Sequence, residues 1–317
     1  MNPQPANLNA QLSGEFAFID WIRRQTSADP RVPIGIGDDA AALRLTPGRE
    51  VLVTTDMILE GVHFERPRAS ARAIGRKAMA VNLSDIAAMA GVPVAAVASV
   101  GLPRDFRNHD AEELFHGMHD LAGEFGVALV GGDTNCSESG LVVAITLIGE
   151  ATSRGPVRRS GARLGDWIMV TGSLGGSILS KHLDFTPRVR EAIVLHERCE
   201  LHAMIDVSDG LAADLGHILD ESGCGAILRA DEIPISAEAH NMPGEATSLD
   251  RALYDGEDFE LLFTLPGTEA ERLVADQPLG VRITHIGTVA PESGLWLESS
   301  DGSRRLLAPN GFDHFAR

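Results

Sequence analysis

Segments with the pattern of strands alternate with segments with the pattern of helices along the whole chain, and this alternation restricts the fold more than any other feature. It predicts an α/β (α+β) protein in which helices cover the sheets. Ser70 is placed to cap a helix that Gly91 and Pro93 end. The elements expected in the first half are strands at 50–56, 94–102, 127–130 and 141–149 and helices at 70–90 and 108–125.

The chain is long enough for two domains, because its 317 residues compare with about 100–200 residues per domain. A connector rich in Gly, Arg and Ser follows the last strand of the first half, at 153–166. We therefore expect an N-terminal domain at 1–150 and a C-terminal domain at 151–317. The elements expected in the second half are strands at 167–171, 203–207, 259–265 and 281–289 and a helix at 211–221.

The charge balance excludes several classes of partner. Lys and Arg number 27 and Asp and Glu 45, so the formal net charge is −18. Such an acidic surface repels phosphate backbones, which argues against nucleic acids and anionic membranes as partners. The longest apolar stretch, 92–102, is far shorter than the roughly 20 residues of a membrane span. The start of the chain does not resemble a signal peptide and the three cysteines include no CxxC pair, so we expect a cytoplasmic protein.

Aspartates at expected strand ends, and one inside a helix, are the most informative polar residues. Taken singly, each also fits a turn former or a helix cap. Asp85 differs, because it lies in an alanine-rich helix beside apolar residues, where a carboxylate needs a partner such as a metal ion. A phosphoryl-transfer site with several Mg²⁺ ions is the interpretation that uses them all. The aspartates are Asp38, Asp39, Asp56, Asp85, Asp133, Asp206 and Asp209.

Other candidate phosphate ligands are fewer. Thr54 and Thr55 add oxygens beside Asp56, and Arg159 can pair with phosphate, although an ordinary surface arginine is the alternative. The glycine-rich segment at 172–177, GSLGGS, has N–H groups that can wrap an anion, although such segments are more often structural turns. The chain has no GxxxxGK[ST] loop and neither the HRD nor the DFG motif of protein kinases.

The motifs, in their order along the chain, resemble those of the thiamine-monophosphate kinases, and they span nearly its whole length. NLSD and GGDT also occur in a wider superfamily with aminoimidazole ribonucleotide synthetase and selenophosphate synthetase. The combination of TTD…GVHF, GEDFEL and GFDHF is specific to the kinases. The matching stretches are SGEFAFI (13–19), GIGDDAA (35–41), TTDMILEGVHF (54–64), AVNLSDIAAMA (80–90), GGDT (131–134), RSGARLGDWIMVTG (159–172), AMIDVSDGLAADLGHI (203–218), GEDFELLFT (256–264) and GFDHF (311–315).

The resemblance implies a two-domain, aminoimidazole-ribonucleotide-synthetase-like fold that forms a homodimer through N-terminal-domain strands. It implies transfer of the γ-phosphoryl of ATP to thiamine monophosphate, with several Mg²⁺ ions as cofactors. The implied Mg²⁺ ligands are Asp39, Thr54, Thr55, Asp56, Asp85, Asp133, Asp206 and Asp209. The implied ATP contacts are Gly132, Asp133, Arg159 and Ser208, and the implied contacts to the thiamine end are His63, Glu257 and Phe312.

Two other functions fit parts of the same pattern. Another superfamily enzyme, which makes aminoimidazole ribonucleotide or selenophosphate, would share NLSD and GGDT. Selenophosphate synthetases usually carry a reactive Cys or Sec with a nearby Lys near the start, and residues 1–34 contain neither Cys nor Lys. A non-catalytic sensor of thiamine phosphate or nucleotide would need fewer carboxylates. The chain departs from the family at Phe115 and His116, where a tyrosine is frequent, and its segment 177–201 is short.

Overall fold

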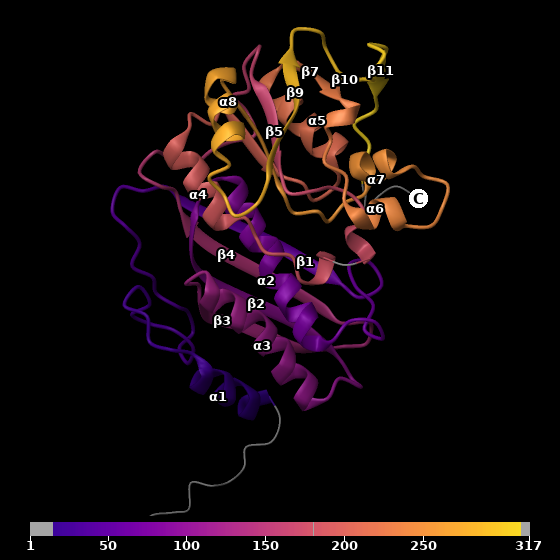
Figure 1. The fold of residues 1–317 in the computed structure, drawn as a ribbon. Coiled ribbons are helices and arrows are strands. Elements are labelled where there is room, and N and C mark those ends of the chain that lie inside the picture. The colour runs from indigo at the N-terminus through magenta and orange to yellow at the C-terminus, as the bar shows by residue number, and fades with distance from the viewer. Residues whose placement is uncertain (1–14, 180, 312–317) are drawn as a thin grey trace, which may run out of the picture.

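Two sheets stacked one above the other form the frame of the molecule (Figure 1). In this computed structural model, residues 15–179 and 181–311 are described. The first sheet contains β1 (Val51–Leu59), β2 (Val92–Pro103), β3 (Ala128–Ser137) and β4 (Val142–Glu150). The second sheet contains β5 (Trp167–Thr171), β6 (Ala203–Asp206), β7 (Gly225–Arg229), β8 (Leu261–Leu265), β9 (Ile283–Ala290), β10 (Leu295–Glu298) and β11 (Arg304–Leu307).

Helices cover these sheets and mixed pairing joins the strands, so the predicted α/β (α+β) class is confirmed. The α-helices are α1 (Glu15–Gln25), α2 (Ala71–Ala88), α3 (Asn108–Glu124), α4 (Val189–Arg198), α5 (Leu211–Ser222), α6 (Ala237–Asn241), α7 (Ser248–Tyr254) and α8 (Gly267–Asp276). The short 3₁₀ helices are η1 (Ser177–Leu179), η2 (Lys181–Leu183) and η3 (Ala230–Glu232). No helix in the described ranges has the length and apolar character to cross a membrane.

The first sheet has the order β1-β4-β2-β3, in which only β2 and β3 run parallel. Helices α2 and α3 cover one of its faces. Helix α2 begins as predicted at Ser70, whose side chain accepts the Ala73 N–H at 3.2 Å. The two helices touch through glycine, because a Cβ on Gly75 would lie 2.0 Å from the carbonyl oxygen of Leu114. This close approach packs α2 directly against α3 and would be blocked by any side chain at position 75.

The second sheet has the order β11-β10-β7-β9-β5-β8-β6. Alternate side chains of a strand point to opposite faces of the sheet, so neighbouring residues of these strands pack into different hydrophobic clusters. Ile168 and Val170 of β5 pack with α5, whereas Met169 packs with α2 and α4. Helix α2 also contacts α4 and β6 directly. One hydrophobic core therefore runs from the first sheet, through α2, to the near face of the second sheet.

Two of the predicted strands are longer than the sequence indicated, and this corrects the position of two aspartates. The strand predicted at 50–56 continues to Leu59, so Asp56 lies within it and not at its end. The strand predicted at 127–130 continues to Ser137, so Asp133 also lies within a strand and not in a loop. Pairing is the physical reason: β3 pairs with β2 as far as Ser137, which overrides the weak strand preference of Gly and Asn.

Candidate active site

Four of the predicted aspartates line one cleft between the two halves of the chain. This acidic cleft has a volume of about 660 Å³. Asp56 comes from β1 and Asp85 from α2, whereas Asp206 is the last residue of β6 and Asp209 lies in the turn after it. Strands from both sheets and the helix between them thus place carboxylates in one space.

Local hydrogen bonds explain why these side chains converge. Residues 52, 54, 56 and 58 of β1 share the face that is turned towards α2, because strand side chains alternate. Thr54 on this face donates its hydroxyl to the Asp85 carboxylate. The backbone N–H of Asp56 donates to the side-chain oxygen of the buried Asn82 at 3.1 Å. Ser84 donates to Asp206 at 2.6 Å, which joins α2 to the end of β6.

Burial, with the charge of Asp85 as the second cause, raises the pKa values of two carboxylates of the acidic cleft to near neutral pH. Burial, followed by the charge of Asp85 and a hydrogen bond with it, raises the pKa of Asp56 to about 7. Burial and the Asp85 charge also raise the pKa of Asp206 to about 7. Burial raises the pKa of Asp85 as well, but the Thr54 hydroxyl and the Arg159 charge oppose this shift. A cation in the cleft would favour the ionised carboxylates and so lower these pKa values.

The donor chemistry of the acidic cleft suits a hard divalent cation. Carboxylates and hydroxyls are oxygen ligands, which Mg²⁺ prefers. Within residues 15–179 and 181–311, no three His, Cys, Asp or Glu side chains converge into a ready-made metal cage. Such an open arrangement fits Mg²⁺, because this ion usually takes one or two carboxylates from the protein and shares the phosphates of a substrate.

Asp214 is a buried carboxylate that the sequence analysis did not single out. One of its oxygens accepts the backbone N–H groups of Ser208, Asp209 and Gly210 at 3.0–3.1 Å. These bonds fix the turn that carries Asp209 into the acidic cleft. Burial, supported by the charges of Asp206 and Asp209, raises the pKa of Asp214 to about 8, while the N–H bonds oppose the shift. Its place in the apolar helix sequence LAADLGHI was the one signal available.

His63 and Glu257 also line the acidic cleft. His63 lies just after β1, and its ring Nδ1 accepts the Leu59 N–H at 3.1 Å. Glu257 has a φ of 66°, in the left-handed region that non-glycine residues rarely adopt. Its carboxylate lies 2.6 Å from the ammonium of the fully buried Lys77. Lys77 is another residue that the sequence analysis did not identify.

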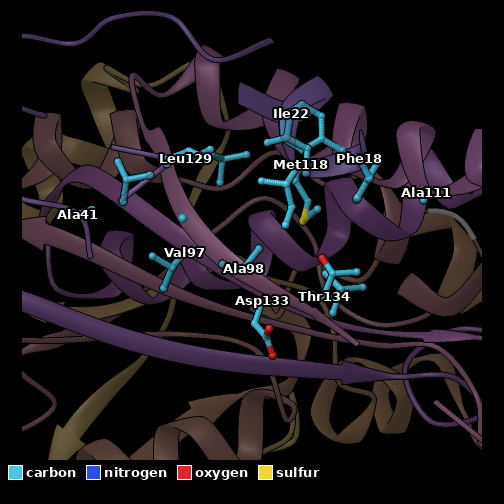
Figure 2. Close-up of a pocket in the computed structure, with 18 of the residues that line it drawn as sticks. Phe18, Ile22, Ala41, Val97, Ala98, Ala111, Met118, Leu129, Asp133 and Thr134 are labelled. Atoms are coloured by element: carbon cyan, nitrogen blue, oxygen red, sulfur yellow. The ribbon is translucent and has the colours of Figure 1, made fainter. Parts of the chain in front are cut away.

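A second cavity, of about 390 Å³, lies beside the first sheet and is mostly apolar. Figure 2 shows apolar side chains around it from α1, α3, β2 and β3. Phe115, which stands near the tyrosine position of the family, is buried and lines this apolar pocket. Its residues include Phe18, Ile22, Val97, Met118 and Leu129.

Three of the predicted ATP and metal ligands belong to the apolar pocket and not to the acidic cleft. Asp39, Gly132 and Asp133 line it, and both aspartates are exposed. In Figure 2 the carboxylate of Asp133 extends from β3 away from Met118 and Phe18. Gly132 is required by packing, because a Cβ there would lie 2.0 Å from the Ala98 carbonyl oxygen of β2. The structure therefore divides the predicted ligands between two cavities.

The remaining predicted residues have separate positions. Arg159 is exposed, and its charge acts on Asp85. Ser208 lines the acidic cleft, whereas Thr55 is on the exposed face of β1, where its hydroxyl donates to the Ile145 carbonyl at 3.1 Å. Phe312 lies outside the described residues.

The glycine-rich segment 172–177 already uses its N–H groups within the protein. The N–H of Gly175 donates to the buried Asp258 at 2.7 Å, and the N–H of Gly176 donates to Asp255 at 3.2 Å. Carboxylates of this chain therefore occupy the positions that a phosphate would need. The hydrogen bonds therefore support the interpretation of segment 172–177 as a structural turn.

Comparison with known proteins assigns both halves of the chain to one superfamily. Residues 37–151 match the N-terminal domain of AIR synthase related proteins, and residues 163–297 match the C-terminal domain. A thiamine-monophosphate kinase of Rhodopirellula baltica is 38% identical over 95% of this chain and 97% of that protein. A crystal structure of the same kinase from Stenotrophomonas maltophilia has 35% identity and a TM-score of 0.81, covering 91% of this chain and 97% of the other.

A further solved structure, named AaThiL complexed with AMPPCP and TMP, has 30% identity and a TM-score of 0.74 and covers 95% of this chain and 97% of that chain. The expected resemblance is thus confirmed over nearly the whole length. By sequence and by fold, the chain belongs to the thiamine-monophosphate kinase family.

Proposed function

We propose that this protein transfers the γ-phosphoryl group of ATP directly to thiamine monophosphate, which yields thiamine diphosphate and ADP. The single observation that carries the proposal is the acidic cleft, where burial raises the pKa values of Asp56, Asp85 and Asp206 and the Asp85 charge adds to the shifts of the other two. Such a cluster costs stability unless cations occupy it. Two phosphorylated substrates would bring those cations. Because the reaction consumes ATP, we place it in the cytoplasm.

Mg²⁺ is the cofactor that the donor set favours. When bound, Mg²⁺ would neutralise the phosphate groups of the two substrates and align them for in-line transfer. Asp56, Asp85, Asp206 and Asp209 would hold it in the acidic cleft, as the raised pKa values of Asp56 and Asp206 support. Thr54 supports Asp85 by a hydrogen bond. The other proposed ligands are Asp39 and Asp133, which line the apolar pocket, and Thr55, which lies on the exposed face of β1.

We assign the apolar pocket to the adenine ring of ATP. Its lining is apolar on several sides, which suits a flat heteroaromatic ring, and Phe115 is buried at its wall. Gly132 and Asp133 stand where the pocket becomes polar. Arg159, whose charge acts on Asp85, and Ser208, in the turn after β6, are the proposed phosphate contacts.

The thiamine end is assigned to the side of the acidic cleft that carries His63 and Glu257. The carboxylate of Glu257 can accept a hydrogen bond from the amino group of the pyrimidine ring. Phe312 is proposed to stack on a thiamine ring, and it lies outside the described residues. The domain boundary after residue 150 also remains our proposal.

The proposed reaction needs no general base. The attacking atom is a phosphate oxygen, which is already anionic at neutral pH. His63 is the one histidine that the sequence analysis placed near the cleft, and its Nδ1 already accepts the Leu59 N–H. A neutral ring in this arrangement carries its proton on Nε2, so neither ring nitrogen is in a position to take a proton from the acceptor. The carboxylates of the acidic cleft would therefore hold cations and orient the phosphates, and would not act as a base.

We expect free thiamine to be phosphorylated at least about a thousandfold more slowly than thiamine monophosphate. Its hydroxyl must lose a proton, and it lacks the phosphate that would share cations with the aspartates. Product formation from each acceptor, with ATP and Mg²⁺ present, should be followed by chromatography of thiamine phosphates. Omission of ATP is the control. Comparable rates with both acceptors would refute the mechanism without a base, and no transfer to thiamine monophosphate would refute the proposed function itself.

We also propose that the protein is a homodimer joined through the outer face of the first sheet. This face is the side that α2 and α3 leave uncovered. Large apolar side chains are exposed along it on β1, where Val51 is 49%, Val53 66% and Met57 53% accessible. Several large apolar side chains exposed along one strand are typical of an interface. Asp133 and Thr55 are exposed too, so a second copy would come close to proposed ligands.

The Val53→Glu variant is therefore expected to be a monomer at concentrations where the parent protein is a dimer. A charge at the centre of an apolar interface would lose its hydration on association. Sedimentation velocity gives the mass, to be compared with 33.7 kDa for one chain. Leu306→Glu is the matched control, because Leu306 is 60% accessible but lies on β11 of the other sheet. A dimer that survives Val53→Glu would place the interface elsewhere.

A further inference from the structure

Lys77 is a fully buried lysine beside the proposed thiamine subsite. It lies on α2 with none of its side chain exposed. Its ammonium donates to the His63 carbonyl oxygen at 2.8 Å and to Glu257 Oε1 at 2.6 Å, and it lies 3.4 Å from the ring Nδ1 of His182. A buried ammonium is stable only with such partners. One side chain of the first half thus contacts three segments around the acidic cleft.

Among these partners, Glu257 is the one whose position depends most on the contact with Lys77. Its backbone is strained, with a φ of 66°, and its N–H donates to the Ser208 carbonyl at 2.7 Å. A strained backbone persists only where its surroundings hold it in place. Lys77 contacts one carboxylate oxygen, and the His182 ring lies 3.4 Å from the other. These two side chains hold the carboxylate in one orientation.

The same contacts decide the hydrogen-bonding character of Glu257. The side chain is 25% exposed and lines the acidic cleft, so part of the carboxylate faces a ligand. Despite burial, which acts in the opposite direction, His182 and Lys77 lower the pKa of Glu257. An ionised carboxylate only accepts hydrogen bonds, whereas a protonated one also donates. A group next to Glu257 must therefore present an N–H or O–H.

We propose that Lys77 is a positioning residue that holds the Glu257 carboxylate as an oriented acceptor, and thereby selects acceptor substrates whose ring presents an amino group. The inference rests on the proposed function, in which Glu257 contacts the aminopyrimidine. Lys77 itself is fully buried, so it acts through Glu257. The corresponding ring with an oxo group in place of the amino group would set a carbonyl oxygen against a carboxylate, which is repulsive.

The Lys77→Met variant tests this role, because methionine fills similar space without charge or hydrogen bonds. We expect the KM for thiamine monophosphate to rise about tenfold or more, with the KM for ATP unchanged and kcat within about threefold. The preference for thiamine monophosphate over its 4-oxo pyrimidine analogue should fall by a similar factor. Lys181→Met is the matched control, since Lys181 contacts Asp258 and Glu260 and not Glu257.

The double variant Lys77→Met/Glu257→Gln keeps the inference testable even if Lys77→Met does not fold, because it leaves no unpaired charge. Relative to Glu257→Gln alone, it should change the KM and the substrate preference by less than about threefold. A larger additional change, or an unchanged KM in Lys77→Met, would overturn the inference while leaving the proposed function intact. An absence of transfer to thiamine monophosphate by the unsubstituted protein would instead refute the proposed function.

Discussion

We expect the Asp85→Asn variant to lose activity by on the order of a thousandfold or more while its fold is retained. Asp85 lies between Asp56, Asp206 and the charge of Arg159, and Thr54 donates to it. Asparagine has nearly the same size, and its carbonyl can still accept the Thr54 hydroxyl. The substitution therefore removes one negative charge from the centre of the acidic cleft and changes little else.

Single-turnover rates at saturating ATP and thiamine monophosphate, with millimolar Mg²⁺, would measure this loss. Thermal unfolding would show that the fold is kept. Asp120→Asn is the matched control, because Asp120 is half-exposed on α3 and pairs with Arg72. It should leave the rate unchanged. Near-normal turnover by Asp85→Asn would mean that Asp85 has a structural role only, and the proposed metal site would have to move.

Without divalent metal, the protein should lose stability as the pH rises from about 4 to about 7. The pKa values of Asp56 and Asp206 are raised from 3.8 to about 7 in the folded state. The folded protein therefore retains protons that the unfolded chain releases over this range, and stability falls as pH rises through the folded pKa. For a coupled pair this amounts to a few kcal/mol, or several degrees in Tm.

Calorimetry in EDTA between pH 4.5 and 8 would measure this slope, and Asp56→Asn should flatten it. Asp214 and Asp258 also have raised pKa values and act in the same direction, so the difference between variant and parent isolates the acidic cleft. Mg²⁺ should raise Tm most above pH 7, where the cleft is fully charged. A slope that Asp56→Asn does not alter would show that the pKa of Asp56 is not raised in the folded protein.

The sequence was sufficient for the order of the elements from β1 to β4 and for the place of Asp85 in a helix among apolar residues, but in the second half it missed several strands and helices. A helix rich in alanine, with a cap at Ser70 and a stop at Gly91, is encoded locally. The carboxylate among its apolar residues stood out for the same reason. The lengths of β1 and β3 could not be predicted, because their ends depend on pairing with β4 and β2. This is why Asp56 and Asp133 were expected at strand ends.

Lys77 and Asp214 could not be predicted, for a different physical reason. A lysine near Arg72 and Arg76 in a helix suggests a solvent-exposed face. Only the fold brings Glu257, which is 180 residues away, to its ammonium. Asp214 likewise looks like an ordinary helical aspartate until the preceding turn directs three N–H groups at it. Partners that are distant in sequence, or made by backbone geometry, cannot be identified from the local sequence.

The hydrophobic core that runs through α2 restricts how the enzyme can open and close. Met79 and Ile86 of α2 are fully buried in the same cluster as Met169 and Phe263 of the second sheet. Swinging the halves apart about a hinge would expose this cluster to water, at about 25 cal/mol for each Å² uncovered. We therefore expect the acidic cleft to keep nearly the same width while substrates enter and products leave.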